Sequence, residues 1–247
     1  NPKYCAEGGC GQTSRSDYNE GERTYSVVVG GGSLMYDWID EDGRDIDIFG
    51  GVHRGFNPAG PKDNVQTGLE AETSVGMELG MRYKNAKRAF ATEAVLFNTI
   101  TDNLIVTDSI GGAGGGTSQN GGKVQSWGLE YSINYDRGLD KGLAYKMPMY
   151  VAATYTSATF LETAGSTADA ESIFSGSNIG NMLPYIPELT LSFGFGQVWS
   201  KWSYNIDANF TSKMWADGAN QSQQINPRTQ NADVRFGDIP SRFVVDG

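Results

Sequence analysis

A strict alternation of large apolar residues with small or polar ones constrains the fold of this 247-residue chain most strongly. Every second position from Trp127 to Tyr135 is large and apolar, through Leu129, Tyr131 and Ile133, and the positions between them hold Gly, Glu, Ser and Asn. Because successive side chains of a β-strand point to opposite faces, this period predicts a strand with one apolar and one polar face. The apolar face must lie either against a protein core or against a lipid bilayer.

The same period recurs along the chain and predicts an all-β protein. The expected strands are residues 24–38, 45–56, 74–83, 88–99, 124–135, 149–159, 189–198 and 202–211, and a ninth begins within 241–247. Each complete strand is close to the ~10 residues that cross a bilayer when a strand is tilted. A transmembrane helix is excluded, because no run of about 18 apolar residues exists.

The lengths of the connections favour lipid over a protein core. Short or middling connections (39–45, 84–88, 136–148 and 199–201) alternate strictly with long ones (57–73, 100–123, 160–188 and 212–240). Consecutive hairpins then place all short turns at one end of the sheet and all long loops at the other. This is the pattern of an outer-membrane β-barrel, with short periplasmic turns and long extracellular loops.

Aromatic residues give a second indication of a membrane-spanning sheet. Six aromatic residues fall near the short-turn end of their strands: Tyr36, Trp38, Tyr83, Tyr135, Trp199 and Trp202. Such residues gather at the edge of a bilayer, because one end of the ring is apolar and the other can form hydrogen bonds. The alternative is a soluble β-sandwich or jelly roll.

Net charge and cysteine content restrict the partners and the compartment. The net charge of -10 argues against nucleic acid, which requires clustered Lys and Arg. Residues 1–22 are expected to form an extracellular loop in which Cys5 and Cys10 close a disulfide in an oxidising compartment, with two free thiols as the alternative. The chain opens on Asn1 and shows no signal peptide, so we expect a mature chain or a piece of a longer one.

Five stretches, in order along the chain, resemble the strand and loop signatures of one family. They are "FGGVHRGFNPAGP" (49–61), "ELGMRY" (78–83), "GGKVQSWGLEYSINYD" (121–136), "NMLPYIPELTLSFGFG" (181–196) and "FTSKMWADGANQ" (210–221). Together they resemble TonB-dependent outer-membrane receptors, in particular those of the ferric dicitrate and siderophore type. The resemblance covers residues 24 to 247.

The resemblance implies a barrel of about 22 strands that encloses an N-terminal plug. Residues 23–247 would then supply 8–9 transmembrane antiparallel strands, about strand 12 to the start of strand 20, without the plug and the last strands. Their outer strands, 23–38 and 202–211, are expected to be edges that the missing strands pair with. The implied function is import of a ferric siderophore, ferric citrate or a similar scarce nutrient, energised by TonB–ExbB–ExbD through the plug. The implied surroundings are outer-membrane lipid and lipopolysaccharide in a Gram-negative cell.

Two other functions remain open: a passive porin-type barrel, and a soluble extracellular β-domain that binds through its surface. The residues offer no catalytic constellation, since His53 is the one histidine, and we expect neither an enzyme nor a resident cofactor. The acidic stretch 37–47 resembles a calcium loop but lacks its closing Glu, which favours a turn at Asp42–Gly43. The glycine-rich stretch 111–122 has no Lys and no following helix, so it predicts a loop and no phosphate site.

Substrate contacts are expected in the long loops and the upper lumen. The polar-face parity of His53 places it in the lumen below the outer rim, whereas Arg54 should point outward, toward lipopolysaccharide phosphates. The candidate substrate-binding residues are His53, Tyr185, Lys213, Trp215, Asn220 and Arg228. The loops carry few cations, which does not favour an anionic ferric chelate.

Overall fold

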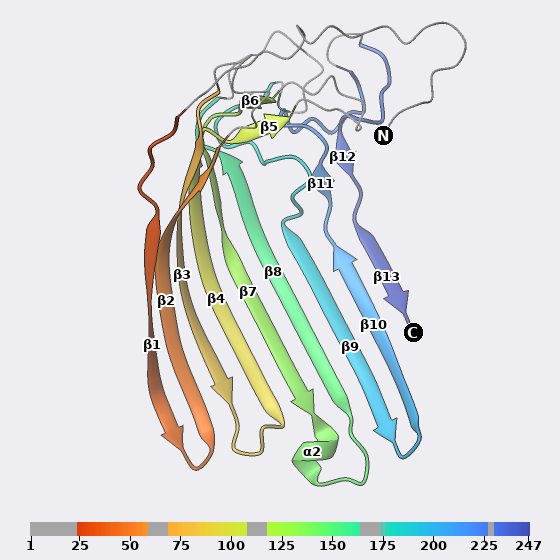
Figure 1. The fold of residues 1–247 in the computed structure, drawn as a ribbon. Helices are drawn as coiled ribbons and strands as arrows, with labels where there is room; N and C mark the ends of the chain where they lie inside the picture. Colours follow the sequence, from red (N-terminus) through yellow and green to blue (C-terminus); the bar gives the residue numbers. More distant parts are fainter. Residues whose placement is uncertain (1–23, 59–68, 108–117, 164–173, 175, 227–229) are drawn as a thin grey trace, which may run out of the picture.

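One antiparallel sheet dominates the structure. A computed structural model describes residues 24–58, 69–107, 118–163, 174, 176–226 and 230–247. Each strand of the nine-stranded sheet pairs with its neighbours in sequence order (Figure 1). The strands are β1 (Gly30–Glu41), β2 (Arg44–Asn57), β3 (Glu72–Lys84), β4 (Phe90–Asp102), β7 (Val124–Asp136), β8 (Pro148–Phe160), β9 (Leu189–Trp199), β10 (Trp202–Thr211) and β13 (Arg242–Asp246).

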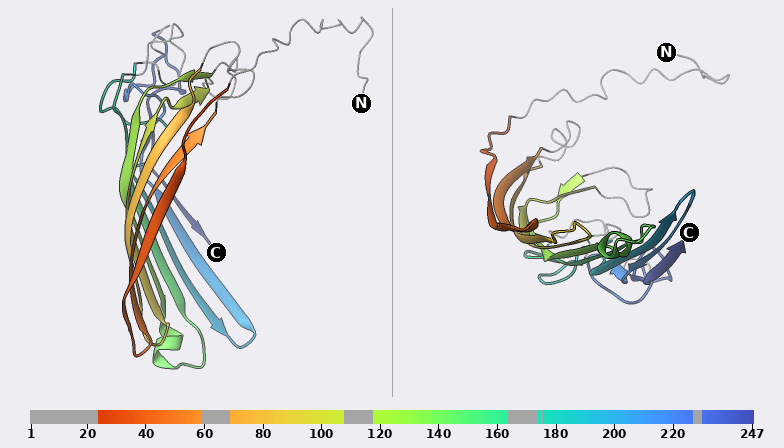
Figure 2. Two further views of the ribbon diagram at one scale, coloured as in Figure 1. Left: turned by 60° about the vertical axis from the view of Figure 1, so that its left-hand side comes forward. Right: turned by 90° about the horizontal axis from the view of Figure 1, so that it is seen from below.

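The sheet is curved like part of a barrel wall, as the view along its strands shows (Figure 2). Short turns lie at one end and all long connections at the other, which confirms the sorting predicted from loop lengths (Figure 1). The long connections also contain two small two-stranded sheets. These pair β5 (Ile105–Thr107) with β6 (Ser118–Asn120) and β11 (Met214–Trp215) with β12 (Asp238–Ile239). Within the described part of the chain, no helix is long and apolar enough to cross a membrane.

Two tight turns explain how the short-turn end is built. β1 and β2 are joined by Asp42 and Gly43, whose φ angles are 51° and 74°. Two positive φ angles match the right-handed twist of the flanking strands, and Asp-Gly tolerates them well. The acidic stretch therefore forms a hairpin turn, as its Asp-Gly pair predicts. β9 and β10 are also joined by a two-residue turn, Ser200 and Lys201, in which Ser200 has a positive φ of 51°.

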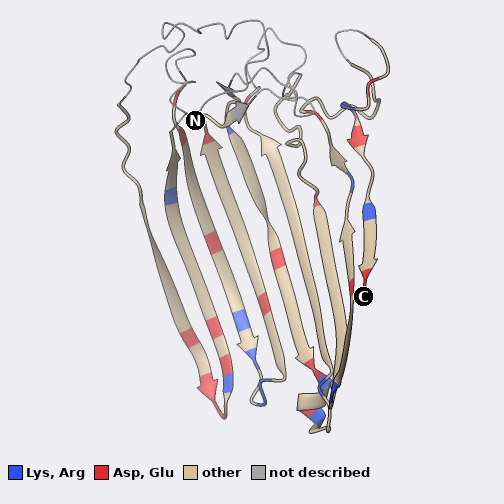
Figure 3. Cartoon of the chain, turned by 45° about the vertical axis from the view of Figure 1, so that its right-hand side comes forward, with Lys and Arg blue, Asp and Glu red and all other residues tan. Residues whose placement is uncertain are grey.

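The registers confirm that the sheet has two different faces. Leu129 lies between Leu96 of β4 and Tyr155 of β8, and all three side chains are exposed on the apolar face. The next residue, Glu130, lies on the opposite face beside Val95 and Thr154. Charged residues are sparse along the middle of the strands and concentrate toward their ends (Figure 3). An exposed apolar face of this width is what a lipid-facing wall requires.

On the polar face, aromatic side chains lie over glycines of the next strand. A Cβ on Gly80 would be 2.3 Å from the Phe49 ring, and one on Gly194 would be 1.9 Å from the Tyr150 ring. The Arg82 guanidinium in turn lies 5.5 Å from the centre of the Phe49 ring. Glycine is needed at these positions because only a residue without a side chain leaves room for the neighbouring ring.

The start of the first strand assigned from sequence is wrong. β1 begins at Gly30, which pairs with Arg54, and not at residue 24. Tyr25 donates its hydroxyl to the Leu69 carbonyl oxygen at 3.1 Å, so the stretch before β1 is held by a side-chain contact. Strand periodicity continues through this stretch, but alternation alone cannot show where pairing stops.

The expected second edge of the sheet is also wrong. β10 is not an edge, because its residues Asp207–Thr211 pair with β13. The edges are β1 and β13. The short alternating run Arg242–Asp246 is sufficient to form a ninth strand, so the pairing extends one strand beyond the eight complete ones in the sequence.

A short helix, α2 (Arg137–Lys141), was not predicted in the connection between β7 and β8. The carboxylate of Asp136 caps its first turn by accepting the Leu139 amide, and Gly142 ends it in the left-handed conformation. Asp before and Gly after five residues are the usual signals of a helix start and stop. The sequence therefore contained the signal, although the segment is too short to show a helical period.

Replacing Leu129, at the middle of β7, by Arg should lower the free energy of unfolding by about 2–4 kcal/mol, because the new charge faces the hydrocarbon core. Ser132→Arg is the matched control, since it places the same group on the polar face beside Glu93 and should cost far less. Urea unfolding of the complete barrel from phospholipid vesicles measures both. Equal losses would contradict the assignment of the two faces.

Candidate functional site

The candidate substrate site lies at the long-loop end, where two connections pack together. Residues 176–188 precede β9 and residues 212–226 follow β10. Antiparallel pairing of β9 with β10 brings these connections to the same point, since Thr190 pairs with Thr211. We call these two segments the rim.

Backbone contacts anchor the first rim segment to β8. The amide of Leu183 donates to the Ala158 carbonyl at 2.9 Å, and the amide of Gly180 donates to Phe160 at 2.9 Å. Phe160 is fully buried and contacts Phe174 edge-to-face, with ring centroids 6.0 Å apart. Val124 joins this small apolar cluster, which fixes the base of the rim to the ends of β7 and β8.

Asn220 joins the two rim segments through its side chain. Its Oδ1 accepts the Met182 amide at 2.6 Å, and its Nδ2 donates to the Met182 carbonyl at 2.9 Å and the Asp217 carbonyl at 3.1 Å. These contacts occupy the amide, so its observed role is to hold the rim together. Direct contact between Asn220 and a substrate remains a prediction.

Tyr185, Lys213 and Trp215 lie together on the rim. The Tyr185 amide donates to the Trp215 carbonyl at 2.8 Å, and the Lys213 ammonium lies 5.0 Å from the centre of the Trp215 ring. Tyr185 has a φ of 60°, which is uncommon for a bulky residue, and its side chain is 47% exposed. Residues held in this conformation tend to cluster at ligand sites. We call these three residues the aromatic rim patch.

A buried carboxylate lies within the second rim segment. Asp217 is 3% exposed, and its Oδ2 accepts the Gly237 amide at 3.0 Å. The Ala216 amide donates to the Gly237 carbonyl at 2.8 Å, which extends the pairing of β11 with β12. Asp217 Oδ1 has no hydrogen-bond partner among the described residues. Asp217 was not predicted as a site residue; its only local signal is the Asp-Gly pair that begins the stretch DGAN (217–220).

Not all of the predicted site residues meet. His53 lies on β2, where its imidazole covers Gly76 of β3 on the polar face of the sheet. Five strands lie between β2 and β10 in the sheet, so the described part of the chain does not bring His53 to the aromatic rim patch. Arg228, Cys5 and Cys10 lie outside the described residues, and so does most of the glycine-rich stretch 111–122.

The charges in and around the rim are mixed rather than basic, as the segment between the rim and β13 shows. The Arg235 guanidinium binds the Asp233 carboxylate at 2.7 Å and holds the pKa of that carboxyl far below its ordinary value. Because Arg235 is neutralised by this ion pair, it contributes little to binding an anion. Lys213 lies over the Trp215 ring and has no carboxylate within ion-pair distance among the described residues. Across the described ranges, no three His, Cys, Asp or Glu side chains form a group that could hold a metal ion.

A second concave site lies on the polar face at the short-turn end. It has a volume of about 310 Å³ and is lined by residues of β4, β7, β8, β9 and β10. Tyr150 donates its hydroxyl to Asp207 at 2.8 Å in its wall, and Gly194 and Gly196 leave the space open. The alternation of the strands predicts the polar face here but not the cavity, because the cavity depends on which side chains lie over which glycines.

The fold is that of an outer-membrane-type wall: nine sequential antiparallel strands, an apolar outer face, short turns at one end and structured loops at the other. Residues 9–246 match the family of TonB dependent receptor-like β-barrels. The chain therefore belongs to this family, whose members are outer-membrane β-barrels of Gram-negative bacteria and are transporters, not enzymes.

Solved structures share this fold at low sequence identity. The ferric citrate transporter FecA in the unliganded form is 21% identical with a TM-score of 0.64, and the match covers 88% of this chain and 29% of that one. The ferric yersiniabactin uptake receptor FyuA from Yersinia pestis is 19% identical with a TM-score of 0.59, over 88% of this chain and 28% of that one. The copper transporter OprC is 14% identical with a TM-score of 0.57, over 88% and 30%. The chain thus spans less than a third of the length of the structures that it matches.

The substitution Asn220→Ala should loosen the rim, because it removes two hydrogen bonds between the rim segments and one within the second segment. One net hydrogen bond is worth about 1 kcal/mol, so amide exchange at Met182 should accelerate about fivefold. Hydrogen exchange followed by mass spectrometry measures this. Asn178→Ala, which removes one local contact to Gly176, is the control and should leave Met182 unchanged. Unchanged exchange in Asn220→Ala would show that the rim is held by other contacts.

Proposed function

We propose that this chain forms part of the barrel wall of a TonB-dependent importer of a ferric siderophore, ferric citrate or a similar scarce nutrient. The observation that carries the proposal is family membership over residues 9–246 together with an ordered rim above a polar barrel face. A plug within the complete barrel would couple import to TonB–ExbB–ExbD. The broad exposed apolar face argues against a soluble β-domain.

The aromatic rim patch is the proposed first contact for substrate. Tyr185 and Trp215 offer flat apolar surfaces with a polar edge, and Lys213 adds one positive charge. Such rings supply much binding surface at a low entropy cost. His53 and Arg228 are proposed to contact substrate from other parts of the closed barrel.

The mixed charge of the rim bears on the class of substrate. The patch contains one cation, Lys213, and nearby Arg235 is paired to Asp233. The patch therefore favours a chelate that is bound mainly through its organic shell rather than through its negative charge. Ferric chelates and copper both occur among the ligands named for the matched structures. A panel of ferric citrate, ferric hydroxamate and ferric catecholate, with a copper chelate alongside, therefore tests substrate class.

Uptake of the labelled panel by cells that carry the complete receptor tests the function. We expect accumulation of one chelate that stops when TonB is deleted or a protonophore is added. A passive porin predicts flux that neither treatment changes, with little preference among solutes. That result would overturn the importer proposal.

Trp215→Ala should weaken binding of the imported chelate about 30-fold, because a buried aromatic contact at the centre of an interface is worth roughly 2 kcal/mol. Trp199→Ala makes the same change at the opposite end of the sheet, where the side chain is exposed beside a short turn, and should leave affinity unchanged. Titration of the purified receptor by tryptophan fluorescence or calorimetry measures both. Equal affinities in the two variants would remove the patch from the site.

A further inference from the structure

Three aromatic rings form a row on the apolar face at the short-turn end. The ring centroids of Tyr83 and Phe90 are 6.0 Å apart, and those of Phe90 and Tyr135 are 6.5 Å apart. All three share the face of Leu129, because Phe90 pairs with Tyr135 and Tyr83 lies two residues beyond Met81 on the apolar parity of β3. This row therefore faces lipid at the level of the periplasmic headgroups.

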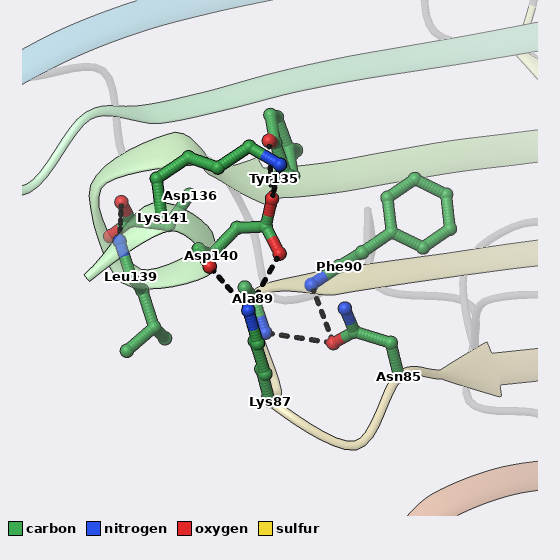
Figure 4. Close-up of polar contacts among 9 residues, drawn as sticks. All are labelled: Asn85, Lys87, Ala89, Phe90, Tyr135, Asp136, Leu139, Asp140 and Lys141. Carbon is green, nitrogen blue, oxygen red and sulfur yellow. Dashed lines mark hydrogen bonds and ion pairs between the residues drawn. The ribbon is translucent and has the colours of Figure 1, made fainter. Parts of the chain in front are cut away.

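Charged side chains from two turns meet directly beside this row. The Tyr135 hydroxyl donates to Asp140 Oδ2 at 3.1 Å, and the Lys141 ammonium lies 2.9 Å from the same oxygen (Figure 4). Lys87, from the turn between β3 and β4, lies 3.6 Å from Asp140 Oδ1 and donates to the Asp140 carbonyl at 2.6 Å. Because Tyr135 faces lipid, these contacts place both ammonium groups on the outer side of the barrel.

Both turns that carry the cations are held in place. Asn85 Oδ1 accepts the amides of Ala89 at 2.9 Å and Phe90 at 3.0 Å, which fixes the turn that bears Lys87 (Figure 4). The Asp136 carboxylate accepts the amides of Leu139 and Met147, each at 3.0 Å, which fixes both ends of the α2 connection. The backbone that carries Lys87 and Lys141 is therefore fixed by hydrogen bonds.

The cluster carries excess positive charge next to exposed apolar side chains. Asp140 provides one negative charge against Lys87 and Lys141, which remain 61% and 62% exposed despite their contacts. The Lys141 ammonium holds the pKa of Asp140 below its ordinary value, and Asp140 raises the pKa of Lys141, so these two stay ionised at neutral pH. Leu139 is 51% exposed and extends away from the cluster (Figure 4). A ligand with a phosphate and an acyl chain matches this combination.

We propose that Lys87 and Lys141, positioned by Asp140 and Tyr135, bind the phosphate of an anionic phospholipid in the periplasmic leaflet of the outer membrane. The lipid tails would lie along the row of Tyr83, Phe90 and Tyr135, and Leu139 would enter the headgroup layer. This site is separate from the rim at the other end of the barrel, so it does not depend on the identity of the imported substrate.

Native mass spectrometry of the complete receptor with added phosphatidylglycerol or phosphatidylcholine tests the proposal. Each cation near a headgroup favours an anionic lipid, so we expect phosphatidylglycerol to bind at least about tenfold more tightly than phosphatidylcholine. The double variant Lys87→Gln/Lys141→Gln should lose this preference. Lys146→Gln/Lys201→Gln removes the same number of charges from short-turn connections at this end and should retain it.

The remaining outcomes separate a lipid site from its alternatives. Inorganic phosphate at millimolar concentration should not displace the lipid, because it lacks the chain that Leu139 and the rings contact; displacement would indicate a free-phosphate site and overturn the proposal. If both double variants kept the preference for phosphatidylglycerol, the proposal would also be overturned. If both lost it equally, the preference would be a diffuse charge effect and the proposal would fail as well. Heat-modifiable migration verifies that each variant is folded. We expect Lys87→Gln/Lys141→Gln to leave substrate uptake unaltered, so failure of the lipid proposal can be told apart from failure of the proposed transport function.

Discussion

The satisfaction of backbone hydrogen bonds within lipid is the constraint on which this structure depends. Each unpaired N–H or C=O group costs several kcal/mol in hydrocarbon, so a membrane-spanning sheet must pair every strand on both sides. The registers pair every neighbouring strand from β1 to β10, with one irregularity between Asp37 and Ile39 of β1, near the short-turn end. β1 and β13 each have a strand partner on one side only within the described chain. Further strands of a closed barrel are the proposed partners of these two edges.

Once the strands are paired, the two faces and two ends of the wall acquire separate roles. The apolar face meets lipid, while on the polar face rings over glycines, such as Phe49 over Gly80, form a dense wall. Short turns with positive φ angles close one end and leave the long connections free to build the rim at the other. The rim can therefore carry proposed substrate contacts, and the turns a proposed lipid contact, without either disturbing the strands.

Sequence predicted what depends on local pattern. Alternation at residues 127–135 gave β7 and its faces, and Asp42–Gly43 gave a hairpin turn. What it missed depends on partners distant in the chain: Gly30 starts β1 because that is where pairing with Arg54 begins. The role of Asn220 in joining two rim segments was likewise missed. Its partner Met182 lies 38 residues away in sequence, and no local pattern encodes that contact.

An accessibility scan of single spin labels at positions 127 to 133 in the complete receptor, reconstituted in a bilayer, tests the central claim of a two-faced transmembrane wall most directly. Relaxation by oxygen reports exposure to lipid, and relaxation by a water-soluble nickel chelate reports exposure to water. The account predicts a period of two residues, with high oxygen access at Trp127, Leu129, Tyr131 and Ile133 and low access at the positions between them. Uniform access, or the opposite phase, would contradict it.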